Sequence, residues 1–329
     1  MIEKRTVFVL GAGASRPYGF PTAVMLRSQI LSHFQDQYLE FLGGAGEKIG
    51  ATRTANGYPS LRDAQHFWEC FDLSSTKSID LFLSRNPQFE KVGKMAICLN
   101  ILHAEKDSRF REQVEKTEAE HDWYFYLYDR LTREATGKED YCRFAENCVT
   151  FVTFNYDRSL EHFLFTSLLH SFGGIDEQKA KEELNKSPVI HVYGKPAPLP
   201  WEQDDEQKVL QYAKHVDNLA SIDLLGIIDN IYVVHGQRPN PNLETARRKI
   251  REAEHVFFLG FGYASENLEA LGIPGVLSTG QRLYGTAMGV ANVTNIMSAL
   301  ESGLSDAQAF AKLKIDAGAD CLKLLHQYL

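Results

Sequence analysis

The feature that most constrains this chain is a short apolar stretch that runs directly into a glycine turn near the N-terminus. Residues 7–10 read VFVL and residues 11–15 read GAGAS. Four such apolar residues predict a buried strand, and glycine lets the backbone turn sharply where a Cβ atom would obstruct a ligand. A helix starting near Ser15 would direct its free N–H groups at the turn, an arrangement that suits a pyrophosphate. The segment therefore predicts the first strand, turn and helix of a nucleotide-binding α/β fold.

Further strands and helices alternate along the rest of the chain. A helix is expected after Thr22, a charged helix at 243–253 and a core helix at 321–329, and strands are expected at 148–154, 188–194, 230–236 and 255–262. Several of these strands end at glycine, as in a doubly wound, Rossmann-like parallel sheet. We predict one α/β domain over residues 1–329, with residues 43–146 as a mainly helical insertion.

Composition excludes several classes of protein. No apolar run approaches the length that spans a bilayer, and the apolar stretch after Met1 ends too early for a signal peptide, which predicts a cytoplasmic protein. The formal net charge of −8 and the lack of a basic stripe argue against direct nucleic-acid binding. The five cysteines show no C-x-x-C spacing, which predicts a site without metal; they are Cys70, Cys98, Cys142, Cys148 and Cys321.

The glycine turn departs from the dehydrogenase fingerprint. That motif needs glycine or alanine at position 16, and this chain has Arg16, which argues against a conventional dehydrogenase. Instead, residues 11–21 read GAGASRPYGFP. This segment resembles the start of the sirtuin-like NAD-binding domain. The resemblance implies that Gly11, Ala12, Gly13, Ser15, Phe20 and Pro21 contact NAD.

A second segment carries the same resemblance. Residues 153–160 read TFNYDRSL and follow an expected strand, which places Asn155 and Asp157 at the carboxyl end of the sheet. In sirtuin-like proteins the corresponding Asn contacts the nicotinamide-side ribose or the attacking group, and the Asp holds the nicotinamide carboxamide. Asp157 is also well suited to cap the following helix.

His191 is the expected general base. It lies on a strand that ends at the binding crevice, and an imidazole titrates near neutral pH. The family places a histidine directly before the glycine, whereas here Tyr193 precedes Gly194. Tyr193 shares a strand face with His191, so either side chain could point into the site, and a buried core histidine is the alternative.

Weaker matches complete the resemblance. Gly260, Gly262 and Asn267 occupy a strand, turn and helix start that is similar to the loop holding the adenosine ribose. Residues 285–289 could line the adenine, and Asp80 could either reach the site or serve its own helix N-terminus.

The zinc-binding module of the classical deacetylases is missing, because no cysteines stand at ribbon spacing in the middle of the chain. The resemblance is therefore to the zinc-free prokaryotic branch, and it implies an NAD⁺ glycohydrolase that releases nicotinamide and ADP-ribose in antiphage defence. It also implies a homo-oligomer and a separately encoded HerA-type hexameric ATPase as partner. An NAD-dependent deacylase and a non-catalytic NAD- or ADP-ribose-binding module are the alternatives.

Overall fold

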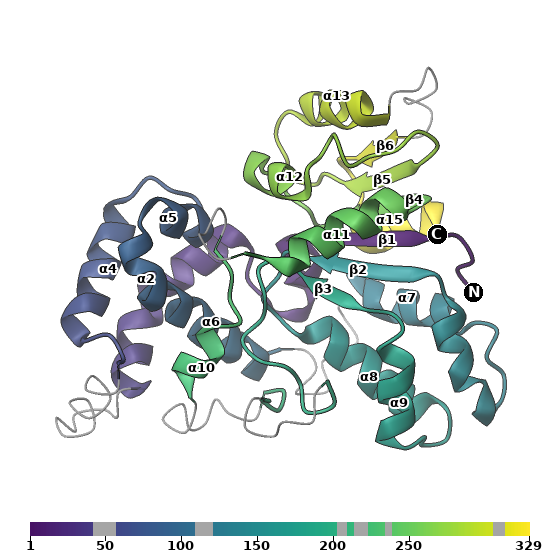
Figure 1. The fold of residues 1–329 in the computed structure, drawn as a ribbon, viewed down its shortest axis with the longest axis horizontal. Coiled ribbons are helices and arrows are strands. Elements are labelled where there is room, and N and C mark those ends of the chain that lie inside the picture. Colours follow the sequence, from purple (N-terminus) through teal and green to yellow (C-terminus); the bar gives the residue numbers. More distant parts are fainter. Residues whose placement is uncertain (42–56, 109–120, 203–208, 214–222, 234–238, 305–312) are drawn as a thin grey trace. The chain divides into compact units, whose positions relative to one another are not determined.

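The computed structural model in Figure 1 describes most of the chain: residues 1–41, 57–108, 121–202, 209–213, 223–233, 239–304 and 313–329. Two compact units are present. The first comprises residues 1–17, 113–192 and 240–329, and the second comprises residues 18–112 and 193–239. The expected insertion at residues 43–146 is thus divided between the two units.

The first unit is built on an all-parallel sheet. Its six strands in the described part of the chain are β1 (Thr6–Leu10), β2 (Val149–Thr153), β3 (Val189–His191), β4 (His255–Leu259), β5 (Arg282–Thr286) and β6 (Leu313–Asp316). They lie in the order β3-β2-β1-β4-β5-β6. This is the doubly wound, Rossmann-like α/β fold that the sequence predicts.

The centre of the sheet is apolar on both faces, as parallel sheets require. Every residue of β1 is buried, and Phe8 pairs in register with Phe151 of β2 and Phe257 of β4. The Phe8 ring lies 5.4 Å from the Phe151 ring and 5.3 Å from the Phe257 ring, measured between centroids. This row of three aromatic rings packs across the strands whose carboxyl ends carry the candidate site.

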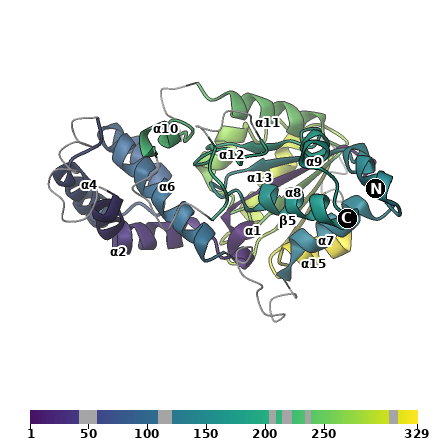
Figure 2. The same ribbon diagram turned by 90° about the horizontal axis from the view of Figure 1, so that it is seen from below.

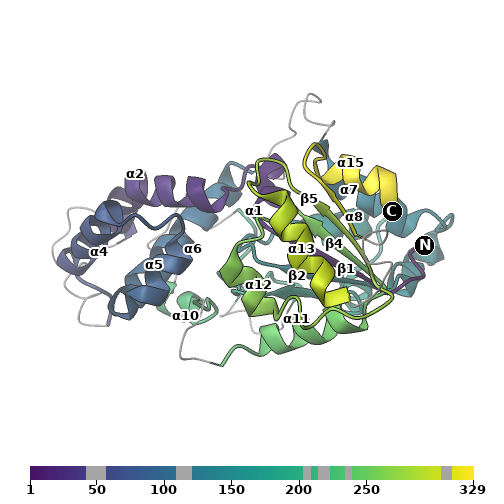
Figure 3. The ribbon, with the colours of Figure 1, turned by 90° about the horizontal axis from the view of Figure 1, so that it is seen from above.

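Helices cover both faces of this sheet. α11 and α12 lie on one face, and α7, α8 and α15 lie on the other (Figures 2 and 3). The helical elements of the unit are α1 (Ala12–Ser15), α7 (Trp123–Thr132), η4 (Lys138–Glu146), α8 (Ser159–Ser171), α9 (Glu177–Leu184), α11 (Pro241–Glu252), α12 (Ser265–Leu271), α13 (Val293–Leu304) and α15 (Cys321–Tyr328). Leu324 and Leu325 of α15 are buried, which confirms the expected core helix at the C-terminus.

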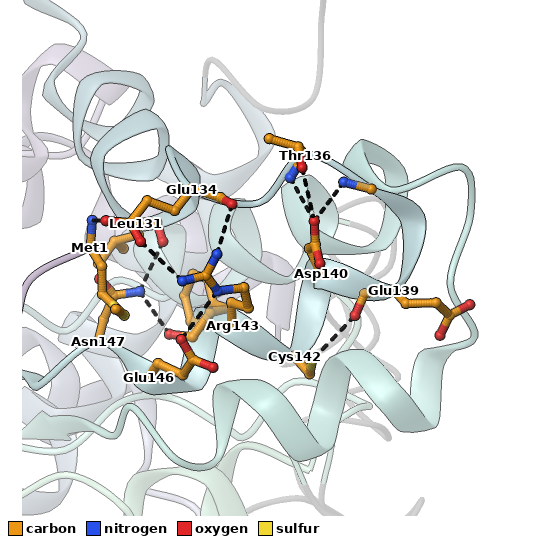
Figure 4. Close-up of polar contacts among 12 residues, drawn as sticks. Met1, Leu131, Glu134, Thr136, Glu139, Asp140, Cys142, Arg143, Glu146 and Asn147 are labelled. Atoms are coloured by element: carbon orange, nitrogen blue, oxygen red, sulfur yellow. Dashed lines mark hydrogen bonds and ion pairs between the residues drawn. The ribbon is translucent and has the colours of Figure 1, made fainter.

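Side-chain hydrogen bonds anchor the chain where it enters β2 (Figure 4). The Asn147 amide donates to the carbonyl oxygens of Leu131 and Phe144, at 2.8 and 2.9 Å, and accepts from the Ile2 N–H at 2.7 Å. The Arg143 guanidinium donates to the Glu134 carboxylate at 3.0 Å. Asn147 thereby ties the start of β2 to the residues that precede β1.

The second unit is mainly helical. Its elements are η1 (Arg16–Tyr18, shared with the first unit), α2 (Ala23–Phe41), α4 (Leu61–Leu73), α5 (Ile79–Arg85), η2 (Pro87–Phe89), α6 (Glu90–Lys106) and α10 (Leu224–Ile228). α6 is the central helix, because it packs against α2, α4, α5 and α10. On α2 the buried residues Leu26, Ile30, Phe34 and Tyr38 recur every four positions and form the stripe that faces this core.

The structure corrects the strand expected at 230–236. Residues 231–233 follow α10 in the second unit without joining a sheet, and residues 234–238 lie outside the described part. Ile231 is fully buried, and Tyr232 donates its N–H to the Tyr193 carbonyl oxygen at 3.0 Å. The apolar pattern thus reports burial of this segment rather than strand pairing. Conversely, the sequence pattern does not predict β5 and β6 as strands.

Within the described residues, no helix is both long and apolar enough to cross a membrane.

Candidate functional site

The carboxyl ends of β1, β2 and β4 meet in the middle of the sheet. β1 lies between β2 and β4, so the strand order reverses direction at this point. Ligands of open α/β sheets bind outside the carboxyl ends of the strands at such a switch point. The segments that follow these three strands all belong to the first unit: residues 11–15, 154–157 and 260–263.

The turns after β1 and β4 pack backbone against backbone. A Cβ atom at Gly11 would lie 2.5 Å from the Gly260 carbonyl oxygen, and one at Gly13 would lie 2.8 Å from the same atom. Gly260 has a φ of +54°, and a Cβ atom there would collide with the Ala14 nitrogen. These glycines are required by the contact between the two turns. The missing Cβ atoms of Gly11 and Gly13 therefore admit protein backbone, where the sequence suggested a ligand.

Hydrogen bonds hold the first turn in place. The N–H groups of Gly11 and Gly13 donate to the carbonyl oxygens of Leu259 and Gly260, both at 3.0 Å. From α7, the indole N–H of Trp123 donates to the Ala14 carbonyl oxygen at 2.8 Å. The Gly13 N–H is thus committed to the protein, while Ala12 and Gly13 remain partly exposed. Ala12 and Gly13 are therefore the residues of this turn that a ligand can contact.

Two hydrogen bonds hold the side chain of Asn155 against this turn. Its amide nitrogen donates to the Gly11 carbonyl oxygen at 3.0 Å and to the Ser15 hydroxyl at 2.8 Å. A carbonyl oxygen can only accept, so the Gly11 contact fixes which end of the amide carries the nitrogen. Asn155 is only 8% exposed, and its Oδ1 atom is buried without a hydrogen-bond partner. An unpaired buried acceptor is costly, and it marks a place where a ligand hydroxyl or water can donate.

Asp157 belongs to a buried polar network next to the turn that follows β1. It accepts from the Ser159 N–H at 3.1 Å and from the Ser159 hydroxyl, and Tyr124 of α7 shares a hydrogen bond of 2.9 Å with that hydroxyl. Burial raises the pKa of the Asp157 carboxyl, although hydrogen bonds from Ser159 and Ser15 act in the opposite direction. Asp157 therefore joins Ser15 to the first turn of α8, although the N-cap residue of that helix is Arg158 rather than Asp157.

Both ring nitrogens of His191 are engaged. Nδ1 lies 3.0 Å from the Asn155 carbonyl oxygen, and Nε2 lies 2.6 Å from Oε1 of Glu161 on α8. The two side chains are only 4% and 3% exposed. A general base needs a free nitrogen within reach of the proton it removes. This arrangement argues against the expected role of His191 as the base and favours the buried-core alternative.

The remaining expected residues are distributed as follows. Gly262 is exposed, with no atom within 4 Å of the position that a methyl group would take, and Asn267 lies in the first turn of α12. Phe20, Pro21, Asp80 and Tyr193 belong to the second unit, and Phe20 and Tyr193 are buried. Gly285 and Thr286 belong to β5, and the Thr286 hydroxyl accepts from the Gly260 N–H at 2.8 Å.

The sequence reasoning missed Glu161 and Tyr263. Glu161 is the single acidic residue of α8, and that isolation was an available signal. Tyr263 follows β4 with a φ of +52°, which is uncommon for a residue with a side chain. Its hydroxyl is buried without a hydrogen-bond partner.

No group of His, Cys, Asp or Glu side chains suited to hold a metal ion occurs among the residues that the structure describes.

No protein-family model matches the sequence, and no curated protein matches it.

Proposed function

We propose that this chain is an NAD⁺ glycohydrolase that cleaves NAD⁺ into nicotinamide and ADP-ribose. The observation that carries the proposal is the Oδ1 atom of Asn155, a buried acceptor without a hydrogen-bond partner at the switch point of the sheet. The amide nitrogen of the same side chain is fully used by Gly11 and Ser15, so the acceptor is held in one orientation. A preorganised acceptor of this kind suits a ribose hydroxyl or an attacking water.

Cleavage of the bond between ribose and nicotinamide needs few protein groups besides such an acceptor. When the bond between ribose and nicotinamide breaks, positive charge develops on the sugar, as in other glycosidic cleavages. Nicotinamide departs with the electron pair of that bond, a water molecule then forms the new bond to the anomeric carbon, and the proton that this water loses passes to the solvent. Asn155 would accept a hydrogen bond from that water or from a ribose hydroxyl. Because the cationic centre is strongly electrophilic, the reaction does not depend on a strong base.

Other residues would contact the remainder of the dinucleotide. Ala12 and Gly13 are partly exposed beside Asn155, and Gly262 is exposed on the neighbouring turn. The contacts described above hold these positions in place; they involve Gly11, Ser15, Asp157 and Gly260. The resemblance to zinc-free sirtuin-like proteins, carried by residues 11–21 and 153–160, supports NAD as the substrate. By the same resemblance we propose depletion of NAD in antiphage defence, self-association and a HerA-type ATPase partner.

Nicotinamide release from NAD⁺ by the purified full-length chain tests the proposal, both alone and with a HerA-type ATPase. Asn155→Ala should lower kcat by about 10²–10³-fold, the usual cost of removing one preorganised hydrogen-bonding group. Asn100→Ala is the matched control, because Asn100 is a buried asparagine of α6 whose amide nitrogen also donates twice, to Gln37 and Ala96. That variant should retain the activity of the wild type.

The outcomes separate the alternatives. Wild-type activity in a folded Asn155→Ala variant would refute the role of Asn155. Binding of NAD⁺ or ADP-ribose without turnover under both conditions would indicate a binding module. Release of nicotinamide only in the presence of an acyl-lysine peptide would indicate a deacylase.

A further inference from the structure

The contact between His191 and Glu161 is a buried pair that no step of the proposed reaction uses. His191 lies at the end of β3 and Glu161 lies in the first turn of α8, so the pair joins two elements that flank the segment carrying Asn155. Both side chains are almost completely buried. Removing charged or polar groups from water to this extent costs free energy, so interactions within the protein must offset that cost.

The proton positions follow from the acceptors around the ring. Nδ1 faces the Asn155 carbonyl oxygen at 3.0 Å, and a carbonyl oxygen can only accept, so Nδ1 carries a hydrogen. Nε2 faces Glu161 Oε1 at 2.6 Å, and one proton must lie between these two atoms for so short a contact. Neither nitrogen has a lone pair free for a substrate proton. His191 therefore acts as a donor to the main chain of Asn155.

The hydrogen bond from His191 helps to hold Asn155, the residue whose Oδ1 atom has no hydrogen-bond partner. The Asn155 carbonyl oxygen is held by His191, its N–H donates to the Thr153 hydroxyl at 3.0 Å, and its side-chain nitrogen is held by Gly11 and Ser15. Main chain and side chain are thus anchored separately. Loss of the His191 contact would release the Asn155 carbonyl group, while the contacts of its N–H and its side chain remain.

We propose that Glu161 and His191 form a positioning pair that orients Asn155 toward the ligand, with Glu161 holding the imidazole and the imidazole holding the Asn155 carbonyl oxygen. This inference rests on the proposed function for its catalytic consequence. Its structural part, the protonated Nδ1, stands independently of any substrate. Titratable groups near Glu161 include Asp157, Arg158 and His162 on the same segment and Tyr124 on α7.

Substitution of Glu161 distinguishes a positioning pair from a relay to a base. In Glu161→Gln the amide can donate to Nε2 of a neutral imidazole, so Nδ1 keeps its hydrogen and its contact with Asn155. We therefore expect kcat within about threefold of the wild type, whereas loss of the partner in Glu161→Ala should lower kcat about 100-fold with little change in KM. If His191 were a base that depends on the carboxylate, Glu161→Gln would be as inactive as Glu161→Ala.

Glu183→Ala is the matched control for loss of a buried carboxylate. Glu183 lies on α9, outside the site; it is 5% exposed and pairs at 2.8 Å with Lys186, which follows the end of that helix. It should retain the wild-type kcat. A folded Glu161→Ala variant with wild-type kcat, or a Glu161→Gln variant without activity, would overturn the positioning role. If Glu161→Ala does not fold, Glu161→Gln alone makes the distinction.

Nitrogen-15 NMR of the histidine rings in the ligand-free protein tests the structural part separately. The His191 signal, assigned by its loss in His191→Asn, should show a protonated Nδ1 at neutral pH. An unprotonated Nδ1 would overturn the inference. Absence of nicotinamide release by the wild type would instead refute the proposed function, and the NMR result would still decide how His191 is held.

Discussion

Replacement of Gly260 by alanine should destabilise the first unit strongly. Gly260 has a φ of +54°, and left-handed backbone costs a residue with a side chain roughly 1–2 kcal/mol. The added methyl group would also collide with the backbone at Gly13 and Ala14, and overpacking of this kind costs about 1–3 kcal/mol. The neighbours are main-chain atoms of α1, so they cannot rotate away as the end of a side chain could. We expect a loss of about 2–5 kcal/mol in the free energy of unfolding.

Gly262→Ala is the matched control, two residues further along the same turn. Gly262 does not have a positive φ, and nothing lies within 4 Å of the position that a methyl group would take. A substitution of this kind leaves the free energy of unfolding unchanged or raises it by up to about 1 kcal/mol, because alanine gives the unfolded chain less conformational entropy than glycine does. The pair of variants therefore isolates the contact between the turns from any general effect of removing glycine.

Urea-induced unfolding followed by tryptophan fluorescence provides the measurement. The chain has three tryptophans, and Trp123 donates to the Ala14 carbonyl oxygen beside the contact. With Trp68 and Trp201 replaced by phenylalanine, the fluorescence reports on the first unit alone. If Gly260→Ala loses no more stability than Gly262→Ala, the proposed close packing of the two turns is wrong. Weaker NAD⁺ binding by a fully stable Gly262→Ala would, in addition, place a ligand at the exposed turn.

Two further predictions concern buried titratable groups. Burial, with the nearby charge of Arg158, lowers the pKa of His162 from 6.5 to about 4, so the unfolded chain binds a proton in this range that the folded chain does not. The free energy of unfolding should therefore fall by roughly 3 kcal/mol as the pH decreases from 6.5 to about 4. Urea unfolding at several pH values should show that His162→Gln lacks this decrease. The same dependence on pH in His162→Gln and in the wild type would contradict the prediction. Tyr263→Phe removes a buried hydroxyl that has no partner, so the free energy of unfolding should stay the same or rise by about 1 kcal/mol. A loss larger than about 1 kcal/mol would show that the hydroxyl is satisfied in solution.

The sequence was sufficient for the class of the fold and for the meeting of Asn155 with the glycine turn. Residues 7–10 and 148–154 are apolar runs followed by glycine or by Asn155, and strands of this type occur in the middle of parallel sheets. Because all strands of such a sheet end on the same edge, the residues directly after them were expected to meet. The structure places Asn155 against Gly11 and Ser15, as this reasoning requires.

Only the tertiary structure decided what these residues do there. A glycine in the sequence indicates that a Cβ atom is not tolerated, but the Gly11 position is crowded by Gly260, which lies in the turn after β4, far along the chain. Likewise, the role of His191 depends on Glu161, 30 residues away on α8. Hydrophobic patterns report how deeply a segment is buried, whereas its partners come from contacts between distant parts of the chain. For this reason the sequence predicted where the site lies, and the fold determined which of its groups remain free to act.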